Sequence, residues 1–284
     1  FGVGRIRSIF MYPFSFDEFL SAIGESILIE HKQTSNGQSP LAEAIHNKLI
    51  NYFKTFLIIG GMPEVVKSYI ETHDLLKCQQ KITDIILTYT DDFSKYKKRV
   101  QGSNISKIFR SVAKFSGQKF IYSQASESMN LRHVKEIIDL LLMAGLIIPV
   151  THSSGNGVPL GAETNEKFRK FLIFDNGIAQ QLAGLNIADI IIGSDFESVN
   201  KGYIAELFAG LELIKYGSCY QRQELYYWLR EDKIGNAEVD YLIEYNFNIL
   251  PIEVKSSTKG SMQSLYYFLE KKKISKGLRC SLEN

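Results

Sequence analysis

Apolar residues at helical spacing dominate the first hundred positions. Arg5 to Tyr12 alternates loosely between apolar and polar residues, which predicts a short strand that ends at Pro13. Ser15 is suited to cap a helix over Phe16 to Ile23, with two acids in its first turn. After a polar loop over 33–39, further helices are expected from Pro40 to Gly60, after Pro63, and from Leu75 to Tyr89.

The middle of the chain predicts two helices followed by a strand hairpin. Helical spacing covers Asn104 to Phe115 and Arg132 to Ala144. Short apolar strands at Leu146 to Val150 and Lys170 to Phe174 then flank the polar loop Ser153 to Gly157. Helix, turn, helix and hairpin is the layout of a winged helix, and the alternative is a helical linker with a small sheet.

A winged helix would present its second helix to DNA. This helix offers Arg132, His133 and Lys135 to phosphates, but Glu136 and Asp139 on the same helix would repel them. DNA binding through Arg132 and Lys135 is therefore an expectation that the charges support only in part.

The last third changes to an αβββαβ order. The three consecutive strands are separated by short turns, and a helix precedes and follows them. The predicted elements are a helix over Gly202–Tyr216, strands over Leu225–Glu231, Ala237–Tyr245 and Ile249–Ser256, a helix over Met262–Lys273 and a strand over Gly277–Leu282.

Composition and charge exclude some classes of protein, including disordered and membrane-spanning chains. The chain has 284 residues, of which 45% are hydrophobic, with 33 basic against 31 acidic side chains. That apolar share excludes extensive disorder, and the length favours about two domains. The longest apolar run, Ile137 to Val150, contains Asp139 and is too short to cross a bilayer. Near charge balance means that nucleic-acid binding would need a local basic patch.

Targeting and redox signals favour the cytoplasm. Arg5 and Arg7 are followed by polar residues rather than the apolar stretch of a signal peptide. Cys78, Cys219 and Cys280 stand far apart, so we expect neither a disulfide framework nor a zinc site. We expect no membrane partner.

Two neighbouring strands bring carboxylates together. If the hairpin turn is centred on Asn246 and Phe247, Asp240 lies directly opposite Glu253, and Lys255 shares the face of Glu253. Paired carboxylates beside a lysine suit Mg²⁺ or Mn²⁺, with Lys255 positioning water or stabilising developing charge. The alternative is a structural salt bridge on the sheet.

Two further side chains fit the same site. Glu206, on the helix before the strands, is a candidate third ligand, although a glutamate on a helix is often simply solvated. Gln263, four residues before Tyr267 on the following helix, is a candidate hydrogen-bond donor to the carboxylates.

With these residues in place, positions 202–282 resemble the core of the PD-(D/E)XK nuclease superfamily. Glu206, Asp240, Glu253-x-Lys255 and Gln263-x-x-x-Tyr267 stand in its motif positions. The wider chain resembles bacterial and archaeal AAA-type ATP-binding proteins whose C-terminal domain has this core. The phrases that match are Gly4-Arg5, Tyr12-Pro13-Phe14-Ser15-Phe16, Glu18-Phe19, Gly60-Gly61-Met62-Pro63-Glu64, Tyr227-Trp228 and Ala237-Glu238-Val239-Asp240-Tyr241.

The resemblance implies three parts: the end of an AAA core with its helical lid (1–98), a winged helix-like domain (99–190) and a nuclease-like domain (191–284). Residues 1–14 would be the last strand of the ATPase core, and Arg5 would resemble a nucleotide-sensing arginine. The chain has no GxxxxGK[ST] phosphate-binding loop, so ATP is expected of the longer parent protein rather than of this chain. Assembly into a ring or dimer is compatible with such a parent.

Two functions follow as hypotheses. The first is hydrolysis of nucleic-acid phosphodiesters by Asp240, Glu253 and Lys255, with Mg²⁺ or Mn²⁺ held by Asp240, Glu253 and Glu206. The second is a non-catalytic regulatory ATPase whose degenerate nuclease core binds DNA or protein, since nuclease-like folds also serve in binding.

Overall fold

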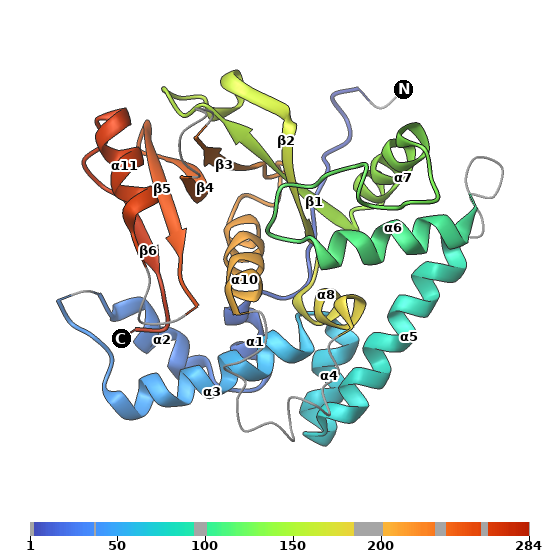
Figure 1. The fold of residues 1–284 in the computed structure, drawn as a ribbon. Helices are drawn as coiled ribbons and strands as arrows, with labels where there is room; N and C mark the ends of the chain where they lie inside the picture. Colours follow the sequence, from blue (N-terminus) through green and yellow to red (C-terminus); the bar gives the residue numbers. More distant parts are fainter. Residues whose placement is uncertain are drawn as a thin grey trace.

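The computed structural model describes residues 3–36, 38–93, 101–184, 201–230, 237–256 and 261–283. These residues form a mixed α/β structure in which helices surround one six-stranded mixed sheet (Figure 1). None of the helices found in these ranges is both long and apolar enough to span a bilayer.

Helices form the first part of the fold. α1 carries the predicted capping box, in which Ser15 accepts from the Glu18 N–H and Glu18 accepts from the Ser15 N–H. Helix α2 was not predicted, and α3 ends at Gly60. The helices are α1 (Phe16–Ala22), α2 (Ser26–Thr34), α3 (Glu43–Ile59), α4 (Pro63–Thr72), α5 (Leu75–Phe93), α6 (Gly102–Lys114) and α7 (Leu131–Met143).

The sheet and its covering helices follow. The strands are β1 (Ile147–Ser153), β2 (Thr164–Ile173), β3 (Leu225–Leu229), β4 (Glu238–Tyr245), β5 (Asn248–Val254) and β6 (Leu278–Cys280). The helices between them are η2 (Leu160–Glu163, a 3₁₀ turn), α8 (Asn176–Ala183), α10 (Lys201–Lys215) and α11 (Gln263–Lys272). The αβββαβ order of the last third is therefore confirmed.

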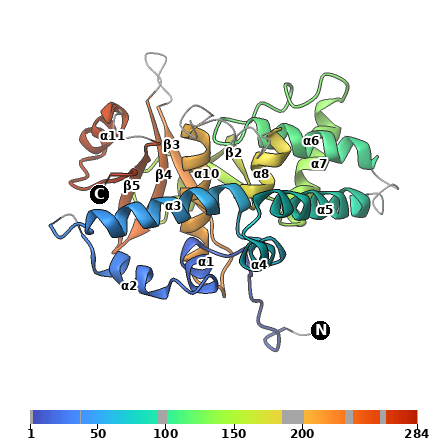
Figure 2. The same ribbon diagram turned by 90° about the horizontal axis from the view of Figure 1, so that it is seen from below.

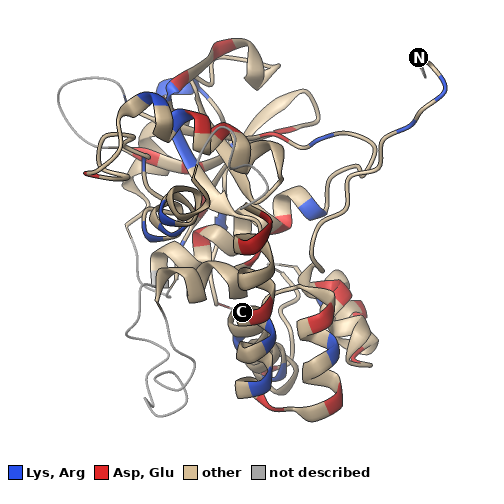
Figure 3. Cartoon of the chain, turned by 90° about the vertical axis from the view of Figure 1, so that its right-hand side faces the viewer, with Lys and Arg blue, Asp and Glu red and all other residues tan. Residues whose placement is uncertain are grey.

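The expected opening strand is wrong. Residues 5–12 have no strand partner in the described parts of the chain, and Val3, Ile6, Ile9 and Met11 are exposed there. The contacts of this segment include a hydrogen bond from the Phe10 N–H to the Cys219 carbonyl (2.8 Å) and the Arg7 guanidinium 3.7 Å from the Tyr220 ring centre. Figure 3 shows the segment extending away from the rest of the molecule.

The predicted hairpin forms but belongs to a larger sheet. β1 pairs antiparallel with β2 and parallel with β3, and the sheet order is β2-β1-β3-β4-β5-β6. The two strands therefore extend the C-terminal sheet, whereas a winged helix would keep them as a separate small sheet. The expected domain limits at 98/99 and 190/191 lie outside the described residues.

Each face of the sheet packs on different helices. α10 and the N-terminal helices contribute to one large apolar core with β1, β2 and the inner residues Tyr227, Tyr241 and Ile252. α11 covers the other face, where Phe268 packs with Trp228 and other apolar residues. In Figure 2, α3 and α5 cross the near side of the molecule, and α11 lies at the edge beyond β5.

A tight junction explains why the chain has glycine at 60 and 61. The Gly61 N–H donates to the buried carboxylate of Asp175 (2.7 Å), which also caps α8 through the Ile178 N–H. A Cβ at Gly61 would lie 2.2 Å from the Phe14 carbonyl oxygen, and one at Gly60 would lie 2.2 Å from an Asp175 oxygen. This junction joins α3, α4 and α8, and it leaves no room for a side chain at position 60 or 61.

Candidate functional site

Three carboxylates meet between α10 and the sheet. Glu206 projects from α10, and Glu238 and Asp240 project from β4. One oxygen from each lies within 4.8 Å of the others. We call Glu206, Glu238 and Asp240 the carboxylate group.

A β-bulge in β4 lies at Asp240 and Tyr241, next to this group. Tyr226 pairs with Leu242 and Trp228 pairs with Val239, so Tyr227 alone stands opposite the two residues Asp240 and Tyr241. Asp240 shares the face of Glu238, which lies two residues before it, and its Oδ2 accepts a hydrogen bond from the Val254 N–H of β5 (2.7 Å). A bulge re-aims side chains, and here the next residue, Tyr241, also reaches α10, where its hydroxyl donates to the Glu206 carbonyl.

The register that the sequence predicts for β4 and β5 is confirmed. Tyr245 pairs with Asn248 and Tyr241 pairs with Ile252, so the turn is centred on Asn246 and Phe247. Both turn residues have positive φ, 49° and 60°, as a two-residue type I′ turn requires.

A lysine from β2 is bound to two of the carboxylates. The Lys170 ammonium donates to Glu206 Oε1 (2.8 Å) and to Glu238 Oε1, and its side chain has no exposed surface. It also lies 4.8 Å from the centre of the Tyr227 ring. Lys170 is therefore a desolvated cation held by two carboxyl groups and an aromatic face.

Burial and charge shift the protonation of the group. Burial raises the pKa of the Glu206 carboxyl to about 8, against the opposing effect of Lys170. Burial likewise raises the pKa of Asp240, although the Val254 hydrogen bond opposes this. Burial lowers the pKa of Lys170, but the charges of Glu206 and Glu238 outweigh it and raise that pKa above its ordinary value. Lys170 thus stays charged while Glu206 retains a proton near neutral pH.

Glu253 and Lys255 form a pair beside the group. The Lys255 ammonium donates to Glu253 Oε1 (2.6 Å), as their shared face predicts. Glu253 lies outside the carboxylate group, and the third carboxylate is Glu238 instead. Glu253 Oε2 is buried without a hydrogen-bond partner among the described residues, and burial raises the pKa of this carboxyl.

The weaker candidates lie on the surface. Gln263 is exposed as the first residue of α11, where its N–H bonds the Ser261 hydroxyl (3.3 Å). Arg132 is exposed and pairs with Glu136 one turn along α7 (3.1 Å). Lys135 is exposed 5.9 Å from the Tyr122 ring centre, and Arg5 is exposed in the N-terminal segment. Their roles toward DNA and nucleotide stay predictions.

Sequence reasoning missed Glu238 and Lys170. Glu238 could have been found, because it precedes Asp240 by two residues in one strand and such residues share a face. Lys170 opens the apolar run Lys170 to Phe174, and a charge in such a run indicates a buried partner. Its partners lie 36 and 68 positions away, which no local pattern reveals.

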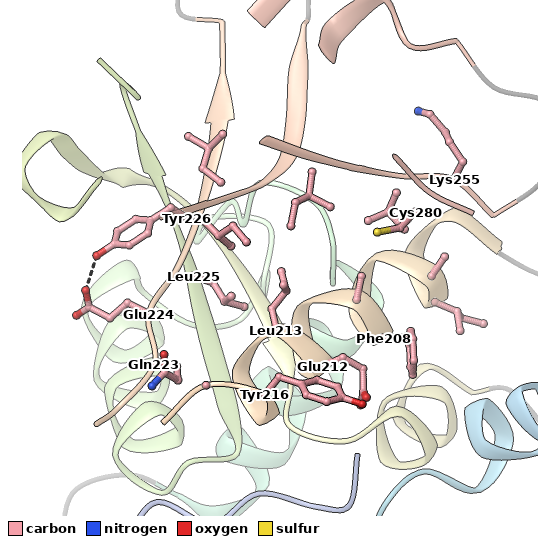
Figure 4. Close-up of a pocket in the computed structure, with 18 of the residues that line it drawn as sticks. Phe208, Glu212, Leu213, Tyr216, Gln223, Glu224, Leu225, Tyr226, Lys255 and Cys280 are labelled. Carbon is pink, nitrogen blue, oxygen red and sulfur yellow. Dashed lines mark hydrogen bonds between the residues drawn. The ribbon is translucent and has the colours of Figure 1, made fainter. Parts of the chain in front are cut away.

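An apolar cleft of about 1120 Å³ adjoins the site along α10. Phe208 and Leu213 of α10 line this cleft. Lys255 and Cys280 lie at the end opposite Tyr226 (Figure 4). Lys255 lines this cleft, whereas Lys170 reaches the carboxylates. Lys170 is therefore the lysine that contacts the carboxylate group directly, whereas Lys255 contacts Glu253.

Comparison with known families divides the chain into two matched regions. Residues 50–189 match a domain of unknown function, DUF8612, and residues 201–283 match another, DUF4143. Domains of the DUF4143 kind are common in proteins associated with AAA-type ATPases. No curated protein and no solved structure gives a significant match. The carboxylates lie in the second matched region, and Lys170 lies in the first.

Proposed function

We propose that this protein binds Mg²⁺ or Mn²⁺ at Glu206, Glu238 and Asp240 and hydrolyses phosphodiester bonds of nucleic acid. The observation that carries the proposal is the approach of three carboxylate oxygens to within 4.8 Å of one another. The αβββαβ order and the neighbouring Glu253-Val254-Lys255 support it.

The carboxylate group fits a hard divalent cation. Carboxylate oxygens are the ligands that Mg²⁺ and Mn²⁺ prefer, and two oxygens on opposite sides of Mg²⁺ are about 4.2 Å apart at about 2.1 Å each. Adjacent oxygens around such an ion are only about 3.0 Å apart, so three oxygens within 4.8 Å of one another would close in on a bound cation. Binding of the cation would displace the Glu206 proton, and with Lys170 charged the resulting local charge of −2 matches one divalent ion.

The residues divide the chemistry between them. A bound divalent ion would polarise a phosphoryl oxygen and lower the pKa of an attacking water. Glu206, Glu238 and Asp240 hold that ion, and the Lys170 ammonium fixes the position of two of them. Lys255, held by Glu253, contributes positive charge near the phosphate. Hydrolysis adds water across one P–O bond and leaves a phosphomonoester and a free hydroxyl.

Basic and aromatic side chains gather on the α11 face of the sheet, opposite the face that carries the carboxylate group. Arg230, directly after β3, lies 4.7 Å from the Tyr267 ring centre, and Lys271 lies 5.7 Å from the same ring. Lys271 also lies 5.8 Å from the Trp228 ring. Positive charge held over aromatic rings suits contact with a phosphate backbone, so a nucleic acid bound at the carboxylates would meet this cluster only by passing round the edge of the sheet.

A second function is favoured by the Lys170 ion pairs. Because an ammonium already neutralises part of the carboxylate group, the same residues can serve as a structural network without metal. The protein would then be the DNA- or protein-binding part of an AAA-type regulatory ATPase, and ATP would bind the parent protein. The cleavage assay below separates the two functions.

The test is cleavage of end-labelled single- and double-stranded DNA and RNA with Mn²⁺ or Mg²⁺. We expect wild-type protein to cut at least one of these substrates, and EDTA to stop the reaction. Asp240→Asn should lose about 100-fold or more of the rate, because it removes a ligand charge. Glu270→Gln, which alters an exposed acid on α11, should cut like the wild type.

Two results would contradict hydrolysis. One is folded wild-type protein that cuts none of the four substrates. The other is cleavage by Asp240→Asn at the wild-type rate, which would assign the activity to a contaminant or another site.

A further inference from the structure

The position of Lys170 has a consequence for how many cations the site can hold. Its ammonium bridges one oxygen of Glu206 and one of Glu238, from two separate elements. Carboxylates that share a cation in this way are typical of sites with two metal ions, about 3.5–4 Å apart. Here the Lys170 ammonium occupies the position in which a second metal ion would bridge Glu206 and Glu238.

Lys170 cannot easily leave this position. Its side chain has no exposed surface, and it lies against the Tyr227 ring. On β2 it pairs with Val150 of β1, inside the sheet that also carries Glu238. Withdrawing the ammonium would leave a buried charge without its partners, which is strongly unfavourable.

The backbone around Glu206 also limits the space on the far side of the group. A Cβ at Gly117 would lie 3.0 Å from Glu206 Oε2, so the loop after α6 passes close to this carboxylate. The Tyr241 hydroxyl donates to the Glu206 backbone carbonyl (2.8 Å) and fixes this turn of α10. The accessible part of the group is at Glu238, whose side chain is 34% exposed.

We propose that Lys170 is a built-in substitute for a second metal ion and restricts the carboxylate group to one divalent cation. The inference rests on the proposed function, since it assumes that the carboxylate group binds metal. It assigns this control to a residue of the DUF8612 region, outside the DUF4143 region that holds the carboxylates.

The test is calorimetric titration of Mn²⁺ into wild-type protein, Lys170→Met and Lys170→Arg. Wild type and Lys170→Arg should bind one ion. Lys170→Met should bind two ions, or one ion about tenfold or more tightly, because a positive charge close to the site is removed. Lys167→Met, which alters an exposed lysine on the same strand, is the matched control and should behave like the wild type.

If Lys170→Met is too unstable for calorimetry, thermal unfolding with and without Mn²⁺ measures its metal binding instead. We expect Mn²⁺ to raise the melting temperature of Lys170→Met by more than it raises that of the wild type. An equal or smaller rise would overturn the proposal.

The outcomes separate this proposal from the function on which it rests. Wild-type binding of one ion, with unchanged stoichiometry and affinity in folded Lys170→Met, overturns only the role of Lys170. Absence of Mn²⁺ binding in both proteins overturns the metal site and the role of Lys170 together. Binding by Lys170→Met alone would overturn the one-ion limit, because Lys170 would then exclude every cation, and it would favour the non-catalytic function for the wild type.

Discussion

Glu206 shows how a single residue acquires its properties from what surrounds it. The sequence offers it as a candidate third ligand, although one acid on a helix is often simply solvated, and the fold buries it beside Lys170 and two further carboxylates. Desolvation disfavours its charged form more than the ammonium favours it, so the pKa rises to about 8. The folded protein therefore binds a proton that the unfolded chain releases.

This proton predicts how stability depends on pH. A raised carboxyl pKa contributes stability that is fully present below pH 4.5 and is lost as the pH rises through about 8. Glu206→Gln cannot release this proton. Its free energy of unfolding should therefore fall less steeply across that window, by up to about 1.4 kcal/mol per pH unit.

Urea unfolding of wild type and Glu206→Gln at several pH values between 5 and 8 measures the effect. Glu270→Gln, at an exposed position, is the control and should keep the wild-type slope. Parallel pH profiles for wild type and Glu206→Gln would show that Glu206 is ionised throughout, contrary to the account.

The hairpin of β4 and β5 shows how an element positions the site. Its turn sets the register that places Asp240 next to Val254, and Glu238 lies on the face of Asp240 because it precedes it by two residues on β4. The turn is nevertheless built at a cost, because Phe247 is 95% exposed and has a φ of 60°. A bulky side chain is disfavoured in that left-handed conformation.

Phe247→Gly should therefore stabilise the protein. Asn-Gly is the preferred pair for a type I′ turn, and removing the left-handed strain should add about 1 kcal/mol to the free energy of unfolding. Phe247→Ala removes the ring but keeps the strain, so it should give a smaller gain. Chemical denaturation measures both variants. Equal stability of the two would mean that the backbone at 247 is not strained.

At the scale of the whole molecule, the sheet unites the two matched regions. β1 and β2 come from the DUF8612 region, and β3 to β6 come from the DUF4143 region. The parallel pairing of β1 with β3 joins them, and Lys170 crosses to Glu206 and Glu238 over this junction. The carboxylate group and its internal cation therefore depend on both regions being folded together.

Local patterns predicted most elements, and nonlocal contacts explain the failures. Helical spacing and capping found α1 and α7, and turn symmetry found the β4–β5 register. The parallel pairing of Val150 with Leu225 joins residues 75 positions apart, so no periodicity could reveal that the hairpin enlarges the C-terminal sheet. Separations of 36 and 68 positions likewise hid the partners of Lys170. The expected strand over 5–12 failed because alternation alone does not supply a pairing partner.

The central claim is that Glu206, Glu238 and Asp240 together bind a divalent cation. Its most direct test is calorimetric titration of Mn²⁺ into wild type, Glu238→Gln and Glu270→Gln, because Glu238 belongs to the carboxylate group and Glu270 is an exposed acid on α11. We predict that wild type and Glu270→Gln bind the ion and that Glu238→Gln binds it about tenfold or more weakly. Folded wild-type protein that binds no Mn²⁺, or Glu238→Gln that binds it as tightly as the wild type, would contradict the account.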